Sequence, residues 1–445
     1  MNKEAKNTRR QFVKNSALVT AGALAAPILS RANFFSAADD SIKVALIGCG
    51  GRGTGAAMQA CLTKQNVKLV AMADAFRDKL DTCYKSLTAD DLSESGVAGN
   101  IKNKIDVPEE RKYVGFDAYK KAMADADVVI LTTPPGFRPI HFEEAVKQGK
   151  QIFMEKPVAT DPAGIKKVLE SAEMAKQKKL NVVVGLQRHY QNSYRELYKR
   201  KEKIGQIVSA QAWWNSDGVW VNPRKPGQSE MEYQMRNWYY FNWLCGDHIV
   251  EQHIHNIDVI NWFKGGYPVK AQGMGGRQVR NGKDHGEIFD HHYVEFQYAD
   301  GSILNSQCRH IPHTMSKVDE LIVGTKGKMF CGAGLINENN GQVVFQFDSK
   351  KENNPYQTEH DELFAAIAKG EYKFADAENG AKSTMTAIMG RMATYSGQVM
   401  EWDKLLNSGI SIMPKDFAWN AMPPTTPDAN GYYPIAVPGK TIYLS

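Results

Sequence analysis

The chain has 445 residues and a formal net charge of +6, with 42% hydrophobic and 23% charged residues. This length holds roughly two to three domains, and the composition is that of a globular protein with enough apolar residues for large buried cores. Most of the positive charge lies in the first 38 residues, where six Lys and Arg face one Glu. Since the remainder has no basic patch, we expect no nucleic-acid partner.

The first 38 residues resemble a twin-arginine (Tat) export signal of bacteria. The run Arg9–Lys14 (RRQFVK) is followed by an apolar, Ala-rich stretch from Ala17 to Leu29 and then by small residues. This stretch is too short to span a bilayer comfortably, and its order of charged, apolar and small residues is that of a cleavable signal. We therefore expect residues 1–38 to be a signal peptide that engages the Tat export machinery, a periplasmic location and no stable membrane insertion.

A dinucleotide-binding fingerprint follows the signal. The apolar, β-branched run Ile42–Ile47 predicts a buried parallel strand, and the G-x-G-x-x-G motif comes directly after it. A helical pattern, a second strand at Val67–Ala73 and an acid at its end complete the context that this motif requires. We expect NAD rather than NADP, because a carboxylate after the second strand accepts hydrogen bonds from ribose hydroxyls, although Arg77 nearby weakens that preference. The expected cofactor-binding residues here are Gly48, Gly50, Gly51, Arg52, Gly53 and Asp74.

Further buried strands are predicted at Asp127–Thr133, Gln151–Glu155 and Val182–Leu186. Ligands of open α/β sheets bind where parallel strands end, at their carboxyl edge. We therefore expect four more residues to meet the cofactor, with the last also a candidate active-site cation: Thr133, Pro134, Glu155 and Lys156. Residues 39–160 are predicted to form a Rossmann domain.

The pattern changes after about residue 203, where seven short strands of alternating character are predicted between 208 and 347. They indicate a large open, mainly antiparallel sheet, so the fold class is α/β with two different sheets. Residues 161–400 are expected to form a substrate-binding α/β domain whose last helices are able to pack back on the Rossmann domain, and residues 401–445 an irregular tail. The segment from Trp213 to Trp243 is dense in aromatic residues, which suit the C–H faces of sugar rings but also plain core packing.

The segment Gly246–Trp262 predicts a buried helix that carries several ionisable groups. One face is apolar, and beside it a second stripe holds His248, Glu251, His255 and Asp258. Buried ionisable groups are costly unless they are paired or take part in chemistry. His253 and His255 point about 200° apart on a continuous helix and cannot share an ion. His248, Glu251 and His255 could share one, but we expect acid–base chemistry and no metal.

Together these residues resemble the Gfo/Idh/MocA family, the glucose–fructose oxidoreductase and inositol dehydrogenase relatives. The resemblance rests on Gly48–Gly53, Asp74, Glu155-Lys156-Pro157 and Glu251-x-x-x-His255-x-x-Asp258, and covers roughly residues 42–400. It implies a Rossmann domain followed by an open-sheet domain and NAD(P)-dependent redox chemistry on sugars and polyols. It further implies that Lys156 holds the substrate hydroxyl and that His255 is the general acid/base. The sequence differs from the family pattern at two positions: Glu251 stands where the family usually has Asp, and His253 where it often has Gly. Both differences leave the substrate class open.

We therefore expect an oxidoreductase that moves a hydride from a secondary alcohol of a sugar or glycoside to tightly bound nicotinamide. Catalysis is assigned to Lys156, Glu251 and His255, since His titrates near neutrality and a cation stabilises an alkoxide. Two alternatives stay open: a glycosidase or lyase that oxidises a ring carbon transiently with no net redox change, and a sugar-binding protein without turnover. An open sheet favours a homo-oligomer, a dimer or tetramer. The expected substrate-binding residues are Arg188, His189, Trp238, Tyr239 and Asp258.

Overall fold

The computed structural model describes residues 41–93 and 96–444. The expected signal peptide, residues 1–38, lies outside the described residues. In the described part, no helix combines the length and apolar character that a bilayer crossing requires.

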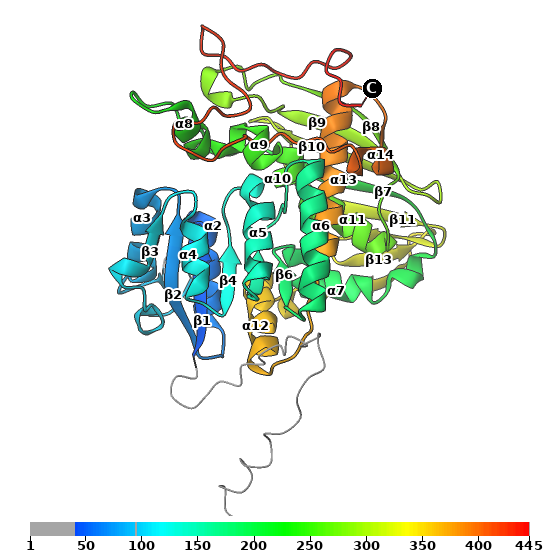
Figure 1. The fold of residues 1–445 in the computed structure, drawn as a ribbon. Coiled ribbons are helices and arrows are strands. Elements are labelled where there is room, and N and C mark those ends of the chain that lie inside the picture. The colour runs from blue at the N-terminus through cyan, green and yellow to red at the C-terminus, as the bar shows by residue number, and fades with distance from the viewer. Residues whose placement is uncertain (1–40, 94–95, 445) are drawn as a thin grey trace, which may run out of the picture. The chain divides into compact units, whose positions relative to one another are not determined.

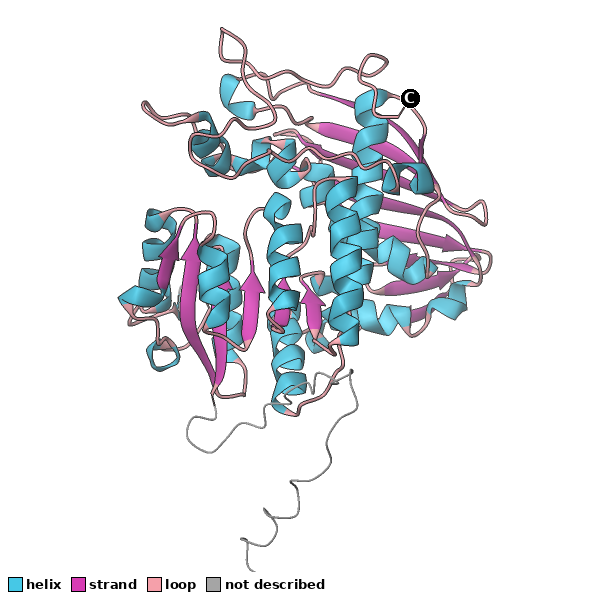
Figure 2. Ribbon diagram, in the orientation of Figure 1, coloured by secondary structure: helices cyan, strands magenta, loops and turns pink. Residues whose placement is uncertain are grey.

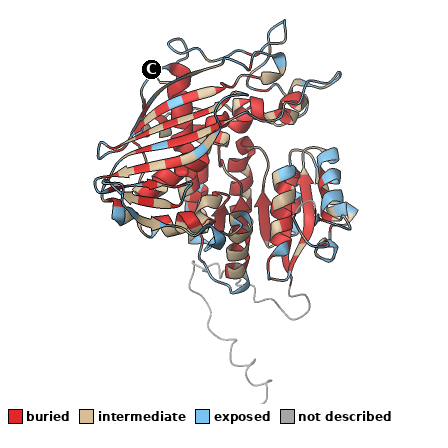
Figure 3. Ribbon diagram, turned by 180° about the vertical axis from the view of Figure 1, so that it is seen from behind, coloured by how far each residue is buried: buried red, intermediate tan, exposed pale blue. Residues whose placement is uncertain are grey.

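The first sheet is parallel throughout and has the strand order β3-β2-β1-β4-β5-β6. This order reverses direction between β1 and β4, which is where doubly wound sheets bind dinucleotides. Apart from the edge strand β3, the strands are mostly apolar and buried, as parallel strands under helices must be (Figure 3). Their bounds are β1 Ile42–Ile47, β2 Val67–Asp74, β3 Lys112–Val114, β4 Val128–Leu131, β5 Gln151–Met154 and β6 Val182–Val184.

Helices connect and cover these strands (Figure 1). A later helix, α12, returns from the end of the chain and packs against α2, the helix that follows the glycine motif. The bounds are α2 Gly51–Leu62, α3 Arg77–Leu87, α4 Ala118–Ala124, α5 Arg138–Lys147, α6 Pro162–Gln177 and α12 Pro355–Ala368.

The second sheet has nine strands in the order β14-β13-β12-β11-β7-β10-β9-β8-β15. Neighbours run antiparallel except β7 and β10, which are parallel, and Figure 2 shows the strands in magenta. The α/β class and both sheets are thus confirmed. The bounds are β7 Ile207–Ser216, β8 Lys270–Gly276, β9 His291–Gln297, β10 Ile303–His310, β11 Lys317–Gly324, β12 Gly327–Phe330, β13 Leu335–Glu338, β14 Val343–Gln346 and β15 Met400–Glu401.

One face of the nine-stranded sheet is covered by helices. The long helix α13, orange in Figure 1, contacts β8, β9 and α6. Side chains of β9 and β10 alternate between buried and more exposed positions. Alternate side chains point to opposite faces of a sheet, so the face opposite the helices is less covered by the described residues. The remaining helices are α7 Asn192–Tyr198, α8 Glu230–Arg236, α9 Asn242–Cys245, α10 His248–Glu251, α11 Ile254–Lys264, α13 Ala377–Ser396 and α14 Trp402–Leu406.

The predicted helix over Gly246–Trp262 is two helices, α10 and α11, separated at Gln252 and His253. The carbonyl of His248 accepts both the Gln252 and His253 N–H groups, at 3.0 and 3.1 Å, which widens the turn. Strands β3, β13 and β15 were not predicted from the sequence, and the expected tail begins with the end of β15 and with α14. Residues 407–444 form no further helix or strand.

Candidate active site

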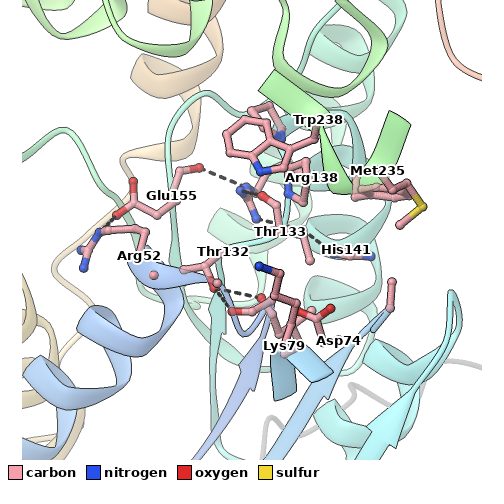
Figure 4. A pocket seen from close by; sticks show the side chains of 18 of the residues that line it. Arg52, Asp74, Lys79, Thr132, Thr133, Arg138, His141, Glu155, Met235 and Trp238 are labelled. Carbon is pink, nitrogen blue, oxygen red and sulfur yellow. Dashed lines mark hydrogen bonds and ion pairs between the residues drawn. The ribbon is translucent and has the colours of Figure 1, made fainter. Parts of the chain in front are cut away.

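A cavity of about 690 Å³ runs from the carboxyl edge of the parallel sheet to the aromatic segment before α10. Its walls come from the ends of β1, β2, β4 and β5, and from β7, α8, α10 and α11. Figure 4 shows part of this lining. Twelve residues of the expected site lie on it: Gly48, Gly50, Gly51, Arg52, Asp74, Thr133, Pro134, Glu155, Lys156, Trp238, Glu251 and His255.

The glycine turn between β1 and α2 fits a dinucleotide phosphate. Gly48 has a φ of +99°, and a Cβ there would lie 2.5 Å from the Thr133 nitrogen. A Cβ on Gly53 would lie 2.0 Å from the Gly48 oxygen, so this residue lets α2 pack onto the strand. At Gly50 and Gly51 an added Cβ would meet no described atom within 4 Å, which leaves the start of α2 open to the cavity. A helix start with free N–H groups binds anions.

Asp74 ends β2 beside this turn and lines the cavity. Its carboxylate accepts hydrogen bonds from the backbone N–H groups of Cys49 at 2.7 Å and Phe76 at 2.9 Å. Burial raises the pKa of Asp74, while these two bonds lower it. Arg77 is directed to other partners, since it pairs with Asp81 and Glu109. Neither ion pair places the Arg77 guanidinium beside Asp74. Arg77 is therefore not positioned to bind the additional ribose phosphate that distinguishes NADP from NAD.

Arg52 joins the glycine turn to the later parts of the chain. Its guanidinium pairs with Glu155 of the EKP motif and with Glu359 of α12, the latter at 3.2 Å. Burial alone lowers the pKa of Arg52, but the attraction of Glu155 and Glu359 raises it overall. Burial also raises the pKa of Glu359 well above its ordinary value, and the neighbouring Glu155 raises it further. One cation thus holds two carboxyl groups at the cofactor end of the cavity.

Arg138 and His141 of α5 support the floor of the cavity. The Arg138 guanidinium is buried and donates to the Glu155 carbonyl at 3.0 Å and to the Thr133 hydroxyl at 3.3 Å (Figure 4). Burial lowers the pKa of Arg138 to about 10. His141 Nδ1 lies 3.1 Å from the same hydroxyl. Burial, with Arg138 as a second cause, lowers the pKa of His141 to about 3.

The buried His141 predicts a defined acid sensitivity of the fold. Its pKa is about 3 in the folded protein and about 6.5 in the unfolded chain. The unfolded state therefore binds more protons below pH 6.5, and stability falls as the pH drops toward 3. Between pH 7 and 5 the loss is about 2 kcal/mol. In His141→Asn this loss is absent, so urea titrations at both pH values should show the variant losing about 2 kcal/mol less than the wild type. An equal loss in both proteins would contradict it.

Lys156, Glu251 and His255 meet at the other end of the cavity. The Lys156 ammonium donates to the backbone carbonyl of Glu251 at 2.6 Å and to its carboxylate at 3.2 Å. His255 is 6% exposed, and its Nδ1 is buried with no hydrogen-bond partner among the described residues. Burial lowers the pKa of His255 well below its ordinary value, and the positive charges of Lys156, Arg188 and Arg52 lower it further. The imidazole is therefore neutral near pH 7, and it is a weaker base than a free imidazole rather than one that titrates near neutrality.

Aromatic rings line the cavity beyond these residues. The Trp214 ring stacks on His255 with centroids 6.0 Å apart, and Trp220 meets Trp238 edge-on at 5.8 Å. Trp220 is 44% exposed, so part of its side chain is accessible from solvent. Polar groups, among them Asn222 and Gln252, lie beside the rings. Such a mixture of ring faces and hydrogen-bonding groups suits a carbohydrate.

Four of the expected substrate-binding residues are absent from the described lining. The Arg188 guanidinium donates to the Tyr194 hydroxyl at 2.6 Å, and the Tyr239 ring is buried against His310. His189 Nε2 lies 2.7 Å from the carboxylate of Asp258 and faces a separate cavity of about 300 Å³. Asp258 also accepts from two side chains of α13. These contacts make Asp258 a link between elements rather than a wall of the large cavity.

Other lining residues were not assigned to the site from the sequence, with Trp214 and Trp220 noted only as members of the aromatic segment: Lys79, Arg138, His141, Trp214, Trp220, Asn222, Arg236, Gln252 and Tyr356. The aromatic density of the 213–243 segment was the available signal for the tryptophans. The structure also accounts for His253, whose Nε2 lies 2.7 Å from the Ser306 hydroxyl of β10. This contact anchors the break between α10 and α11 to the sheet.

Comparison with known proteins places this chain in a family. Residues 42–186 match the oxidoreductase family with an NAD-binding Rossmann fold, and residues 195–330 match the GFO/IDH/MocA C-terminal domain. An inositol 2-dehydrogenase of Acidiphilium cryptum is 28% identical over 199 residues, 44% of this chain and 52% of that protein. A 2,7-anhydro-N-acetylneuraminate hydratase of Mediterraneibacter gnavus is 23% identical over 236 residues, 51% and 58% of the two chains. The chain spans about half the length of the curated relatives that it matches.

Solved structures share the fold. The scyllo-inositol dehydrogenase of Lactobacillus casei, crystallised with NAD(H) and scyllo-inositol, superposes with a TM-score of 0.60 at 19% identity, over 82% of this chain and 99% of that one. The two family models follow each other in the order of the two sheets described above. The chain belongs to the Gfo/Idh/MocA family, with an NAD-binding Rossmann domain followed by the family's C-terminal domain.

Proposed function

We propose that the protein is an NAD-dependent oxidoreductase acting on a CH–OH group of a carbohydrate or glycoside. The observation that carries this proposal is the convergence of Lys156, Glu251 and His255 in the cavity that also contains the glycine turn. Bound NAD supplies the acceptor for the hydride. NADP is disfavoured because Asp74 closes the ribose end with a carboxylate and Arg77 is paired elsewhere.

In the proposed reaction Lys156 stabilises the developing negative charge and His255 accepts the proton. An ammonium has three N–H donors, and two of those of Lys156 are held by Glu251, which leaves one for a substrate oxygen. Its charge stabilises the alkoxide that forms as the hydroxyl proton leaves. His255 accepts that proton at Nε2, because its Nδ1 is enclosed by protein. Glu251 thus acts by positioning Lys156, and the stacked Trp214 fixes the plane of the His255 ring.

A second candidate is a redox-neutral glycosidase or lyase. In that reaction NAD oxidises a ring hydroxyl to a ketone, the adjacent C–H becomes acidic, and elimination releases the glycosidic alcohol. In a glycosidase water then adds to the double bond, in a lyase it does not, and in both the hydride returns to the ring carbon. The similarity to a relative named as a hydratase favours this candidate, since hydration changes no net oxidation state. The same Lys156 and His255 serve both reactions.

One experiment separates the candidates. The purified protein is mixed with glycosides and with free sugars, and the reduced-nicotinamide absorbance is followed while products are separated. A keto-sugar accumulating with reduced cofactor supports the dehydrogenase. An eliminated or hydrolysed product without net cofactor change supports the second candidate. If the protein purifies without dinucleotide, binds none when it is added and gives no spectral response, both are contradicted.

We also propose export by the Tat pathway, on the sequence of residues 1–38. Tat export moves folded proteins, so NAD could be captured before the chain leaves the cytoplasm. Fractionation of cells that produce the wild type and an Arg9→Lys, Arg10→Lys variant tests this. Equal periplasmic amounts of both would contradict the proposal.

We propose a homo-oligomer formed through the less covered face of the nine-stranded sheet. Met274 of β8 and Tyr293 of β9 are cross-strand partners on that face, 71% and 38% exposed. Adjacent exposed apolar side chains on a sheet favour burial against a second copy. Light scattering after size exclusion should give a dimer or tetramer mass, and Met274→Lys should lower it. A monomeric wild type would contradict this assembly.

A further inference from the structure

A cluster of metal-binding side chains lies buried away from the residues assigned to the reaction. Asp247 and His248 stand at the start of α10, and His292 lies on the neighbouring strand β9. All three are at most 3% exposed, and one donor atom from each lies within 4.8 Å of the others. The cluster combines two imidazoles with one carboxylate.

The Asp247 carboxylate is the centre of the cluster. One oxygen lies 2.7 Å from His248 Nδ1, and the other lies 3.3 Å from His292 Nε2. That second oxygen also accepts hydrogen bonds from the Phe289 N–H at 2.9 Å and from the Tyr395 hydroxyl. The carboxylate is therefore fixed from several sides, with an imidazole nitrogen against each oxygen.

The hydrogen bonds of His292 determine where its proton lies. The Thr394 hydroxyl has one hydrogen, which it donates to the Arg391 carbonyl at 2.9 Å. Thr394 must then accept from His292 Nδ1, 2.8 Å away, so the neutral ring carries its proton on Nδ1. A neutral ring of this tautomer turns the lone pair of His292 Nε2 toward the Asp247 oxygen, 3.3 Å away, and Nε2 is buried with no hydrogen bond to another described residue. Two lone pairs facing each other away from water repel unless a cation lies between them.

We propose that Asp247, His248 and His292 bind a divalent transition-metal ion, with zinc as the first candidate. Two imidazoles and a carboxylate are a common zinc donor set. Bonds of about 2.0 Å in a tetrahedron place donors about 3.3 Å apart, which matches the 3.3 Å between Asp247 and His292 Nε2, whereas His248 Nδ1, at 2.7 Å from Asp247, has to move outward by about 0.6 Å. Metal-binding histidines commonly donate their other N–H to a fixed acceptor, as His292 does to Thr394.

The proposed ion links α10, which carries Glu251, to strand β9 of the nine-stranded sheet. The His248 ring stacks on His310 with centroids 4.5 Å apart, and His310 Nε2 lies 2.8 Å from the Gln252 amide oxygen. Gln252 lines the large cavity, one residue after Glu251. The metal thus lies behind the cavity wall and holds α10 against β9, without contact to the reacting groups. The proposal does not depend on the reaction proposed above.

Metal analysis of the purified full-length protein tests the site. After dialysis against metal-free buffer, the wild type should contain about one zinc ion per chain. His292→Gln and Asp247→Asn should each lower the metal content by at least about tenfold. The matched control is His291→Gln, the adjacent residue on β9, whose side chain is 43% exposed and pairs with Asp290. It should keep the wild-type content.

A second measurement uses the wild type alone, in case the cluster variants do not fold. Protein stripped with a chelator is dialysed against cobalt(II), and its visible ligand-field absorption is recorded. Uptake of about one cobalt per chain with tetrahedral bands supports the site. A wild type that purifies without metal and gains no cobalt absorption overturns the proposal, and His292 is then an imidazolium paired with Asp247. Metal retained in folded His292→Gln also overturns it, because the ion then lies elsewhere.

Discussion

Replacing His255 by alanine is expected to lower kcat by roughly 10²–10⁴-fold, the usual contribution of a positioned general base. The variant removes the group that accepts the hydroxyl proton and leaves the glycine turn unchanged, because His255 lies on α11, after the parallel sheet. The dissociation constant of NAD should therefore change little. The measurement pairs steady-state rates on a responsive glycoside with fluorescence titration of NAD.

Lys156→Met is the companion change, since it keeps most of the length of the side chain and removes the charge that stabilises the alkoxide. Its kcat should fall as well, with Glu251 left without its ion-pair partner. His313→Ala, a change at an exposed histidine, is the control and should keep the wild-type rate. A His255→Ala protein that turns over at the wild-type rate would remove His255 from the mechanism, whatever the substrate proves to be.

The local parts of the site could be predicted from the sequence because each follows a short-range rule. A strand, a glycine turn and a helix must follow one another within a few residues to hold a dinucleotide, so Gly48–Gly53 and Asp74 were found directly. The carboxyl-edge rule likewise placed Thr133 and Lys156. The family resemblance implied that Lys156 and His255 lie in one site. The periodicity of the sequence could not predict this, because the two residues are far apart in the chain.

The remaining parts depend on contacts between distant segments. Arg52 pairs with Glu359, which reaches it on α12 from the far end of the chain. His189 and Asp258 were expected at the substrate and instead pair with each other, because α11 turns Asp258 toward α13. The break in the helix at Gln252 and His253 is accompanied by hydrogen bonds from these residues to β10. Helical periodicity in the sequence gives no sign of such contacts. Partners of this kind are set by packing of the two sheets.

Gly53→Ala is expected to destabilise the protein by about 3 kcal/mol or more and to abolish NAD binding. A Cβ at this position would lie 2.0 Å from the Gly48 carbonyl oxygen and 2.7 Å from the Thr132 hydroxyl, and the backbone atom cannot rotate away. Helix α2 would have to separate from β1, which moves its N-terminus from the phosphate position. Urea unfolding and NAD titration measure the two effects.

Substitutions at two other glycines near Gly53 distinguish an effect on folding from an effect on cofactor binding. Gly50 has an extended backbone with φ −78°, and its added Cβ would meet no described atom, so Gly50→Ala should fold normally. It should still weaken NAD binding by at least about tenfold, about 1.4 kcal/mol, because the methyl group occupies the approach of the pyrophosphate. Gly55→Ala, inside α2 with its nearest atom 3.5 Å away, should stabilise the helix by up to about 1 kcal/mol and leave binding unchanged. If Gly50→Ala binds NAD as tightly as Gly55→Ala does, the turn is not the phosphate site.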